Sequence, residues 1–271
     1  MPRGISRWLA APLFVVVLSL IASVAHAGND TWNGNVNNLW PNSGNWVGFS
    51  PPGPGETATF DNAGSGNTTI DLNGFVQVNT LLFDTGAAAA YTIGDGPVNS
   101  QTLKLDNLGA ITINNTVTTN QLINAGLDIN AGDVTFTNNG TGDLTIGGNI
   151  LNLTADRVLN IAGSGNVALA GNIIDNAATR GRLTVTKTSS GDLSFTFPGS
   201  IEVRTLNVNS AAGLVQLGAG TTILLDNDGA AGLTSSTGGT ITGGTIQLQT
   251  SGANGDDNGT AAGTTLTINS L

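Results

Sequence analysis

Three five-residue stretches decide the fold: Gly142-Asp143-Leu144-Thr145-Ile146, Gly165-Asn166-Val167-Ala168-Leu169 and Gly191-Asp192-Leu193-Ser194-Phe195. In each stretch, Gly and a turn-forming Asp or Asn precede two apolar residues that are separated by one position. A spacing of two places both apolar side chains on one face of a β-strand. The stretches therefore predict short, half-buried strands, each of which follows a turn.

The intervals between these stretches indicate how the strands are arranged. A fourth copy, Gly132-Asp133-Val134-Thr135-Phe136, comes shortly before the first, whereas the later copies are more widely spaced. The two longer intervals, from Gly142 to Gly165 and from Gly165 to Gly191, suit one coil of a β-solenoid. Similar apolar pairs recur from Ile70/Leu72 to Leu266/Ile268 at a mean spacing that also fits a β-sandwich. Because aromatic residues make up only 5% of the chain, we expect an all-β, right-handed parallel β-helix, with a β-sandwich as the alternative.

The first residues have the pattern of an export signal. Arg3 and Arg7 precede an almost wholly apolar run over residues 8–24, and Ala25-His26-Ala27 supplies the small residues of a cleavage site. We expect residues 1–27 to be a signal peptide, and the protein to be exported. The alternative is a membrane anchor, but the apolar run is short for a span, and no later segment is apolar enough to cross a membrane.

The composition divides the remaining chain into two regions. Residues 28–62 contain a Pro-Gly cluster and three of the four tryptophans, whereas the strand pattern occupies residues 63–271. The aromatic residues of the first region include Trp32, Trp40, Trp46 and Phe49. We expect this region to be a cap that covers the open strand edges and core of a solenoid. The alternative is that these rings form a platform for stacking on sugars.

Charge and residue types restrict the function. The chain has 8 basic and 18 acidic residues and a net charge of −10, and loss of Arg3 and Arg7 would make it more acidic. An acidic surface repels phosphate backbones, so we expect no nucleic-acid partner. The chain has no cysteine, and its single histidine, His26, lies in the expected signal peptide. The mature chain therefore lacks the residues of a serine or cysteine catalytic triad.

The repeats resemble the autotransporter-associated β-strand repeat. The resemblance is carried by Leu183-Thr184-Val185-Thr186-Lys187-Thr188 and the following Ser189-Ser190-Gly191-Asp192-Leu193-Ser194-Phe195, and by the Trp32, Trp40 and Trp46 spacing of the front region. It covers most of residues 30–217. Where the family has a Thr/Gly-rich loop, this chain has Phe197-Pro198-Gly199. The resemblance implies a bacterial β-solenoid of the exported passenger type.

Two acidic clusters are candidate sites. Asp226 and Asp228 alternate with Asn227 and Gly229, which suits calcium, although the closing Glu of a full loop is missing. The same residues form turns, and we favour a turn with no bound cofactor. Asp256-Asp257 could form a carboxylate pair for sugar hydrolysis, but adjacent residues on one turn point in different directions. We therefore expect a loop there.

The basic residues of the later repeats are a third candidate site, because a lyase would use Arg or Lys as a base. They are Arg180, Arg182, Lys187 and Arg204. We favour a solvated strand face for these side chains.

Together these observations predict a non-enzymatic, exported structural or adhesive module that lies outside the cell or at the bacterial surface. Its expected partner is a surface ligand, glycan or protein, whose identity the sequence does not give. The alternatives are a polysaccharide lyase or glycoside hydrolase, and a carbohydrate-binding module. The strand pattern still continues at Leu266-Thr267-Ile268, so the sequence leaves open whether the chain is a fragment whose missing C-terminal barrel associates it with the outer membrane.

Overall fold

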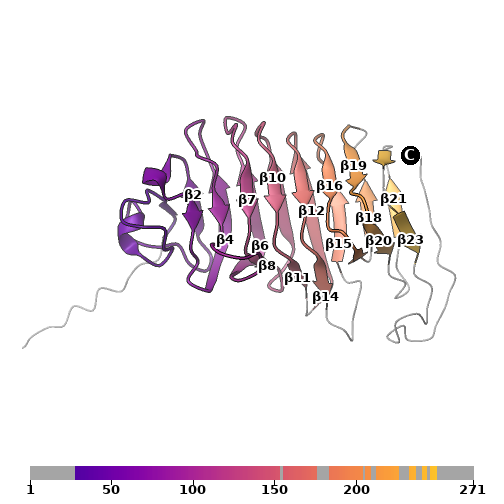
Figure 1. Ribbon diagram of the computed structural model, residues 1–271, viewed down its shortest axis with the longest axis horizontal. Coiled ribbons are helices and arrows are strands. Elements are labelled where there is room, and N and C mark those ends of the chain that lie inside the picture. The colour runs from indigo at the N-terminus through magenta and orange to yellow at the C-terminus, as the bar shows by residue number, and fades with distance from the viewer. Residues whose placement is uncertain are drawn as a thin grey trace, which may run out of the picture.

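The chain forms a rod of stacked β-strands in a computed structural model (Figure 1). The structure describes residues 28–152, 155–175, 183–203, 205–208, 212–225, 232–235, 240–242 and 245–248. Within these ranges, helix is confined to two 3-10 turns, η1 (Ser43–Asn45) and η2 (Gly64–Gly66). The strands run across the long axis of the rod, and the first strands lie at the left end of Figure 1.

The largest sheet extends along one side of the rod from the first strand. Its main path is β1 (Asp30–Thr31), β2 (Thr57–Phe60), β4 (Phe75–Phe83), β6 (Thr102–Ile113), β9 (Val134–Asn138), β12 (Arg157–Gly163), β15 (Leu183–Lys187), β18 (Thr205–Val208) and β21 (Gly232–Ser235). Strand β6 also pairs with β8 (Gly126–Asp128), from which pairing continues to β11 (Ile150–Asn152) and β14 (Ile173–Asp175).

Two further sheets complete the described part of the rod. The second sheet contains β3 (Thr69–Ile70), β5 (Thr92–Ile93), β7 (Gln121–Ile123), β10 (Leu144–Ile146), β13 (Val167–Leu169), β16 (Leu193–Phe195), β19 (Leu214–Leu217) and β22 (Thr240–Thr242). The third contains β17 (Ser200–Val203), β20 (Thr222–Leu225) and β23 (Thr245–Leu248). From β9 onwards the chain visits three sides in turn, since β9, β10 and β11 are stacked on β12, β13 and β14.

The register explains the intervals of the repeat. Leu144 pairs with Val167, and Val167 pairs with Leu193, so each of the two longer intervals corresponds to one coil. The short interval separates β9 from β10 within one coil. Every pairing between these strands is parallel, whereas sandwiches are built from antiparallel sheets. The solenoid prediction is therefore confirmed, and the sandwich alternative is wrong.

The apolar pairs of the repeats form the interior, as their period of two requires. Eight residues that the pattern places inside are buried: Leu144, Ile146, Val167, Leu169, Leu183, Val185, Leu193 and Phe195. The residues between them, among them Thr145, Ala168, Thr184 and Ser194, are half-buried because the neighbouring coils flank them. Burial of each Leu, Val or Phe side chain stabilises the rod by about 1.5–3 kcal/mol.

Aromatic side chains close the N-terminal end of the interior. Trp32 and Trp46 are fully buried and pack edge to face, with ring centroids 5.2 Å apart, and Trp40 packs on Trp46 at 4.8 Å. Phe60 connects this cluster to the first coils, because its ring also stacks on Phe83 at 5.3 Å. The aromatic cluster, which we call the cap, is therefore continuous with the interior of the solenoid.

Each fully buried indole of the cap donates a hydrogen bond to a backbone carbonyl. Trp32 Nε1 donates to Asn67 O at 3.0 Å, and Trp46 Nε1 donates to Trp40 O at 2.8 Å. These bonds satisfy polar groups that would otherwise be buried without a partner. The expectation that Phe49 belongs to the cap is wrong, because the ring is 73% exposed. Phe49 lies on a turn with a φ of 60°, which directs it away from the cluster.

Candidate functional site

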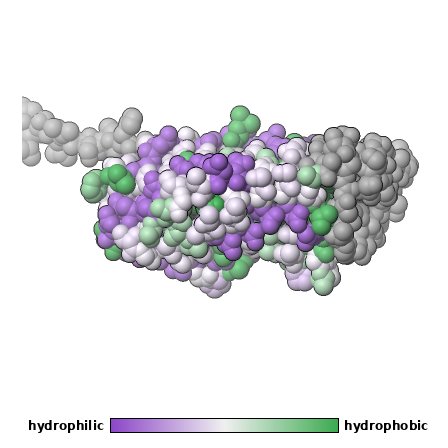
Figure 2. All heavy atoms as spheres, turned by 90° about the horizontal axis from the view of Figure 1, so that it is seen from above, coloured by the Kyte–Doolittle hydropathy of each residue, from purple (hydrophilic) through white to green (hydrophobic). Residues whose placement is uncertain are grey.

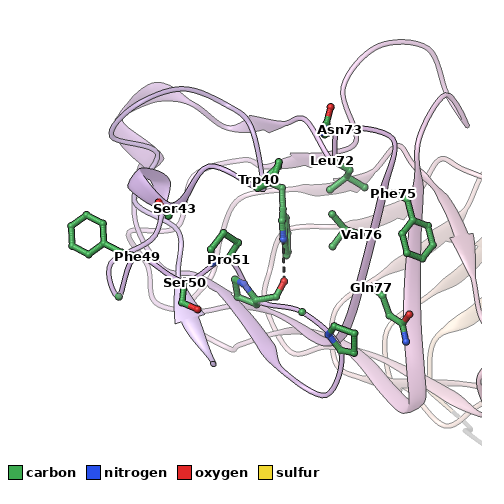
Figure 3. Close-up of a pocket in the computed structure, with 15 residues that line it drawn as sticks. Trp40, Ser43, Phe49, Ser50, Pro51, Leu72, Asn73, Phe75, Val76 and Gln77 are labelled. Carbon is green, nitrogen blue, oxygen red and sulfur yellow. Dashed lines mark hydrogen bonds between the residues drawn. The ribbon is translucent and has the colours of Figure 1, made fainter. Parts of the chain in front are cut away.

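A groove beside the cap is the candidate functional site (Figure 3). It lies between the loop that contains Pro51–Pro54 and the start of β4, and its volume is about 930 Å³. Trp40, Leu72 and Val76 lie at its base. This volume lies within the range of roughly 300–1,000 Å³ that is typical of sites for small ligands.

Two carboxylates outside the groove hold the loops that form it. Asp30 accepts hydrogen bonds from Gly48 N, at 2.9 Å to each carboxylate oxygen, and from Ser50 N at 3.3 Å. Asp106 accepts one from Gly55 N at 2.6 Å and another from the Gln77 side-chain amide. Hydrogen bonds that backbone N–H groups donate to a carboxylate are strong. The loops on both sides of the groove are therefore held by bonds within the protein.

The lining of the groove is mostly apolar and carries no charge. All 15 lining residues lack a charged side chain. Phe75, the outward first residue of β4, is 56% exposed, and its ring stands at one side of the groove across from Pro51. Figure 2 shows that hydrophobic residues gather in only a few separate spots on the face it presents. The exposed ring of Phe75 and the apolar residues of the lining form one such group at the groove, and a group of exposed apolar side chains is typical of a binding surface.

The structure separates the three tryptophans that were predicted as possible stacking residues. Trp32 and Trp46 are fully buried in the cap, so neither presents a ring face to solvent. Trp40 is also buried, but one side of it lines the groove, and its Nε1 donates to Pro52 O at 3.1 Å. Of the three, Trp40 alone therefore belongs to the candidate site.

The basic candidate that the structure describes occupies a different environment from the one predicted. Lys187 is fully buried, so the expectation of a solvated strand face is wrong for this residue. The cause is the alternation of β15, in which Lys187 shares the inward face with Leu183 and Val185. Arg180, Arg182 and Arg204 lie outside the described residues.

The Lys187 amine serves as an internal hydrogen-bond donor. Its Nζ donates to Ser189 O at 2.7 Å and to Ala212 O at 3.1 Å, which ties two neighbouring coils together. Burial lowers the pKa of this amine below its ordinary value, and the Asp192 carboxylate partly opposes the shift. The arrangement satisfies buried carbonyls at a corner of the rod, which is a structural role.

Buried Asn138 has the same role at an earlier corner. Its Nδ2 donates to Gly142 O and to Asn166 O, both at 2.8 Å. Lys187 therefore follows a pattern of inward polar residues that satisfy the turns between the first and second sheets.

A ladder of Asp and Asn side chains follows the turns that precede the strands of the second sheet. Asn120 Oδ1 accepts from Asp143 N at 2.9 Å, and Asn166 Oδ1 accepts from Asp192 N at 3.1 Å. The carboxylates take part as well: Asp143 Oδ1 accepts from the Asn166 amide, and Asp192 Oδ1 accepts from Leu214 N at 2.8 Å. Each side chain thus bonds to the next coil, and we call this series the Asx ladder.

The acidic candidates of the C-terminal part are not placed by the structure. Asp226 and Asp228, the possible calcium ligands, lie outside the described residues, as do Asp256 and Asp257. The part of the chain that is described contains no group of three or more His, Cys, Asp or Glu side chains arranged to hold a metal ion. It also contains no helix with the length and apolar character needed to cross a membrane.

The sequence shows the Pro-Gly cluster but does not by itself reveal the groove. The residue that could have indicated the groove is Phe75, an aromatic residue on the outward face of a strand whose inward face is formed by Val76 and Val78. The position of Gln77 beside it followed from the same alternation. That the loop of Pro51–Pro54 folds against this strand depends on the Asp106 bonds, which local patterns do not reveal.

Comparison with known proteins found no relative of this chain. No family model, no curated protein and no solved structure matches this chain.

Proposed function

We propose that this chain is an exported, non-enzymatic β-solenoid that acts as a structural or adhesive module outside the cell or at the bacterial surface. The basic and apolar leader with its Ala25-His26-Ala27 site supports export. The resemblance to the autotransporter-associated repeat supports a passenger-like role, in which a rod presents its side and its capped end to a surface partner. The partner would be a glycan or a protein, and an acidic chain disfavours nucleic acid.

The Asx ladder is the observation that carries this proposal. Asp143 and Asp192 each accept hydrogen bonds from the next coil, as described above. A general acid or base must reach the bond that it cleaves. These carboxylates instead point along the rod and hold one coil to the next. These carboxylates therefore support a structural role for the rod, in which acidic side chains stabilise the stack of coils.

The groove favours binding over hydrolysis. Glycoside hydrolysis commonly requires two carboxyl groups about 5–9.5 Å apart on either side of the sugar bond. The 15 residues that line the groove include neither Asp nor Glu. A polysaccharide-active enzyme, which remains the second candidate because the groove could admit a sugar chain, would need to place its carboxylates elsewhere.

Export and turnover can be tested together. We expect the full chain, expressed in a Gram-negative host, to leave the cytoplasm and to acquire a mature N-terminus at Gly28, which mass spectrometry of the fractions would detect. A variant that lacks residues 1–27 is the control and should stay in the cytoplasm. The purified protein should not degrade pectin-, alginate- or xylan-type polysaccharides. Retention of the uncleaved chain inside the cell, or release of sugar products above background, would contradict the proposal.

A further inference from the structure

We propose that the groove beside the cap binds an uncharged oligosaccharide. This inference rests on the proposed adhesive function and names the ligand class of that module. The observations that carry it are the apolar surface of the groove, the polar groups at its edge, its lack of charge and its fixed shape.

The apolar surface suits the carbon-bound faces of sugar rings. Phe75 presents a largely exposed ring on the outward face of β4, and Pro51 lies across the groove from it (Figure 3). Leu72 and Val76 form the base, where a ligand would displace water from apolar side chains. Pyranose rings have faces rich in C–H groups that pack against aromatic and proline rings. The groove, which lies between two such rings, is therefore suited to a flat, ring-shaped unit.

Amide groups at the edge of the groove match sugar hydroxyls. Gln77 donates its Nε2 hydrogen to Asp106, which fixes the orientation of the amide. Within the described part of the chain its Oε1 takes no hydrogen bond and can accept one from a hydroxyl. The exposed side chain of Asn73 offers both a donor and an acceptor. Sugar hydroxyls also donate and accept, so a few amides at an apolar wall give both affinity and orientation.

The uncharged lining of the groove favours an uncharged ligand. The chain as a whole has a net charge of −10, yet its groove is lined by 15 uncharged residues. An anionic sugar chain such as a uronate polymer would be repelled by the acidic surface and would find no cation in the groove. A cationic ligand would find no carboxylate partner in the lining, because Asp30 and Asp106 lie outside the groove. A neutral glycan needs no charged partner.

The backbone of the groove is held by hydrogen bonds within the protein. Asn73 has a φ of 52°, which is uncommon for a residue other than Gly, and its N–H donates to Asp71 Oδ1 at 2.8 Å. The Asp30 and Asp106 bonds hold the two loops on either side. A site that is fixed in advance loses less conformational entropy on binding. The internal bonds of the groove therefore favour binding of a ligand that matches its shape.

A proline-rich peptide is the strongest rival ligand, because such peptides also bind aromatic grooves. Indole N–H groups serve well as donors to peptide carbonyls, but the indole N–H in this groove, that of Trp40, already donates to Pro52 O. The polar groups described at the edge are the carboxamides of Asn73 and Gln77, which match the several hydroxyls of a sugar.

Isothermal titration of the purified protein with a panel of oligosaccharides tests the inference. The panel contains neutral gluco-, xylo- and manno-oligosaccharides, oligogalacturonate and oligo-alginate as anionic probes, and a proline-rich peptide. We expect at least one neutral series to bind and the anionic probes to bind at least tenfold more weakly. F75A should raise the Kd of the neutral ligand at least tenfold, and Q77A should raise it severalfold.

Val98→Ala is the matched control, because Val98 is 52% exposed and lies outside the groove. This variant should bind as the wild type does, and melting curves should show that F75A and Q77A remain folded. The inference is overturned if no neutral oligosaccharide binds, if F75A and Q77A bind unchanged, or if the peptide or an anionic probe binds more tightly. Self-association that F75A abolishes would also overturn it. These outcomes leave the export test untouched, so the two proposals can fail separately.

Discussion

Replacing Trp46 by Ala should destabilise the rod from its N-terminal end. The side chain is fully buried, its ring packs on Trp32 and Trp40, and its Nε1 donates to Trp40 O. Truncation of a buried Trp to Ala costs about 3–5 kcal/mol. The Trp40 carbonyl would also lose its donor, at a cost of about 1 kcal/mol or more if it stays buried. We therefore expect a loss of about 4–6 kcal/mol in the free energy of unfolding.

This loss is large enough to be measured by thermal unfolding. For a domain of about 150–250 residues, each kcal/mol shifts Tm by about 2–4 °C, so Trp46→Ala should lower Tm by about 8–24 °C. Circular dichroism melts at matched protein concentration would provide the measurement. Phe49→Ala is the control, because that ring is exposed, and its Tm should stay within about 2 °C of the wild type. An unchanged Tm for Trp46→Ala would refute the reasoning that the tryptophans stabilise the solenoid as a cap.

Three further predictions concern the interior and the turns. Leu169→Asp should prevent folding because it buries an unpaired charge. Thr184→Asp, at a half-buried outward position, should change the unfolding free energy by no more than about half a kcal/mol. Chemical denaturation of both variants checks this, and equal effects would contradict the assigned faces. Lys187 has a lowered pKa in the fold, so the folded state binds fewer protons than the unfolded state, and the wild type should gain stability as the pH rises toward the ordinary lysine pKa. Denaturation between pH 7 and pH 10 should show this slope in the wild type but not in Lys187→Met. A slope that persists in the variant would show that other groups cause it. Asp192→Ala removes the acceptor for Leu214 N and for the Gln216 amide, and should lower the free energy of unfolding by about 1–3 kcal/mol. Asp192→Asn should recover part of that loss. Equal stability of the two variants in chemical denaturation would count against the Asx ladder.

The fold was predictable because its signal is local and repeated. The alternation of Leu144, Thr145 and Ile146 assigns one side chain to each face, and a one-residue slip would expose every apolar group. The spacing of successive copies, from Leu144 to Val167 and from Val167 to Leu193, then sets the length of a coil. The position of the aromatic cluster follows a similar logic, since a stack of coils must cover its first interior layer.

The candidate site was less predictable because it depends on contacts between distant segments. The charge of Lys187 suggests a solvated position, but the period of two places the residue on the inward face, where its Nζ donates to carbonyls of two coils. Composition groups Phe49 with the tryptophans, but the turn that contains Phe49 directs its ring outward. The groove requires Asp106 to hold the loop at Gly55, which lies far away in the sequence, and no local pattern records such a bond.

The most direct test of the account is to detect binding without cleavage at the groove. The purified protein would be mixed with the neutral oligosaccharide that binds best, and saturation-transfer NMR and mass spectrometry would follow the sugar over several hours. The account predicts transfer of saturation to the sugar ring protons, its loss in Phe75→Ala, and recovery of the oligosaccharide at its original mass. Shortened or unsaturated sugar products, or a transfer signal that persists in Phe75→Ala, would contradict it.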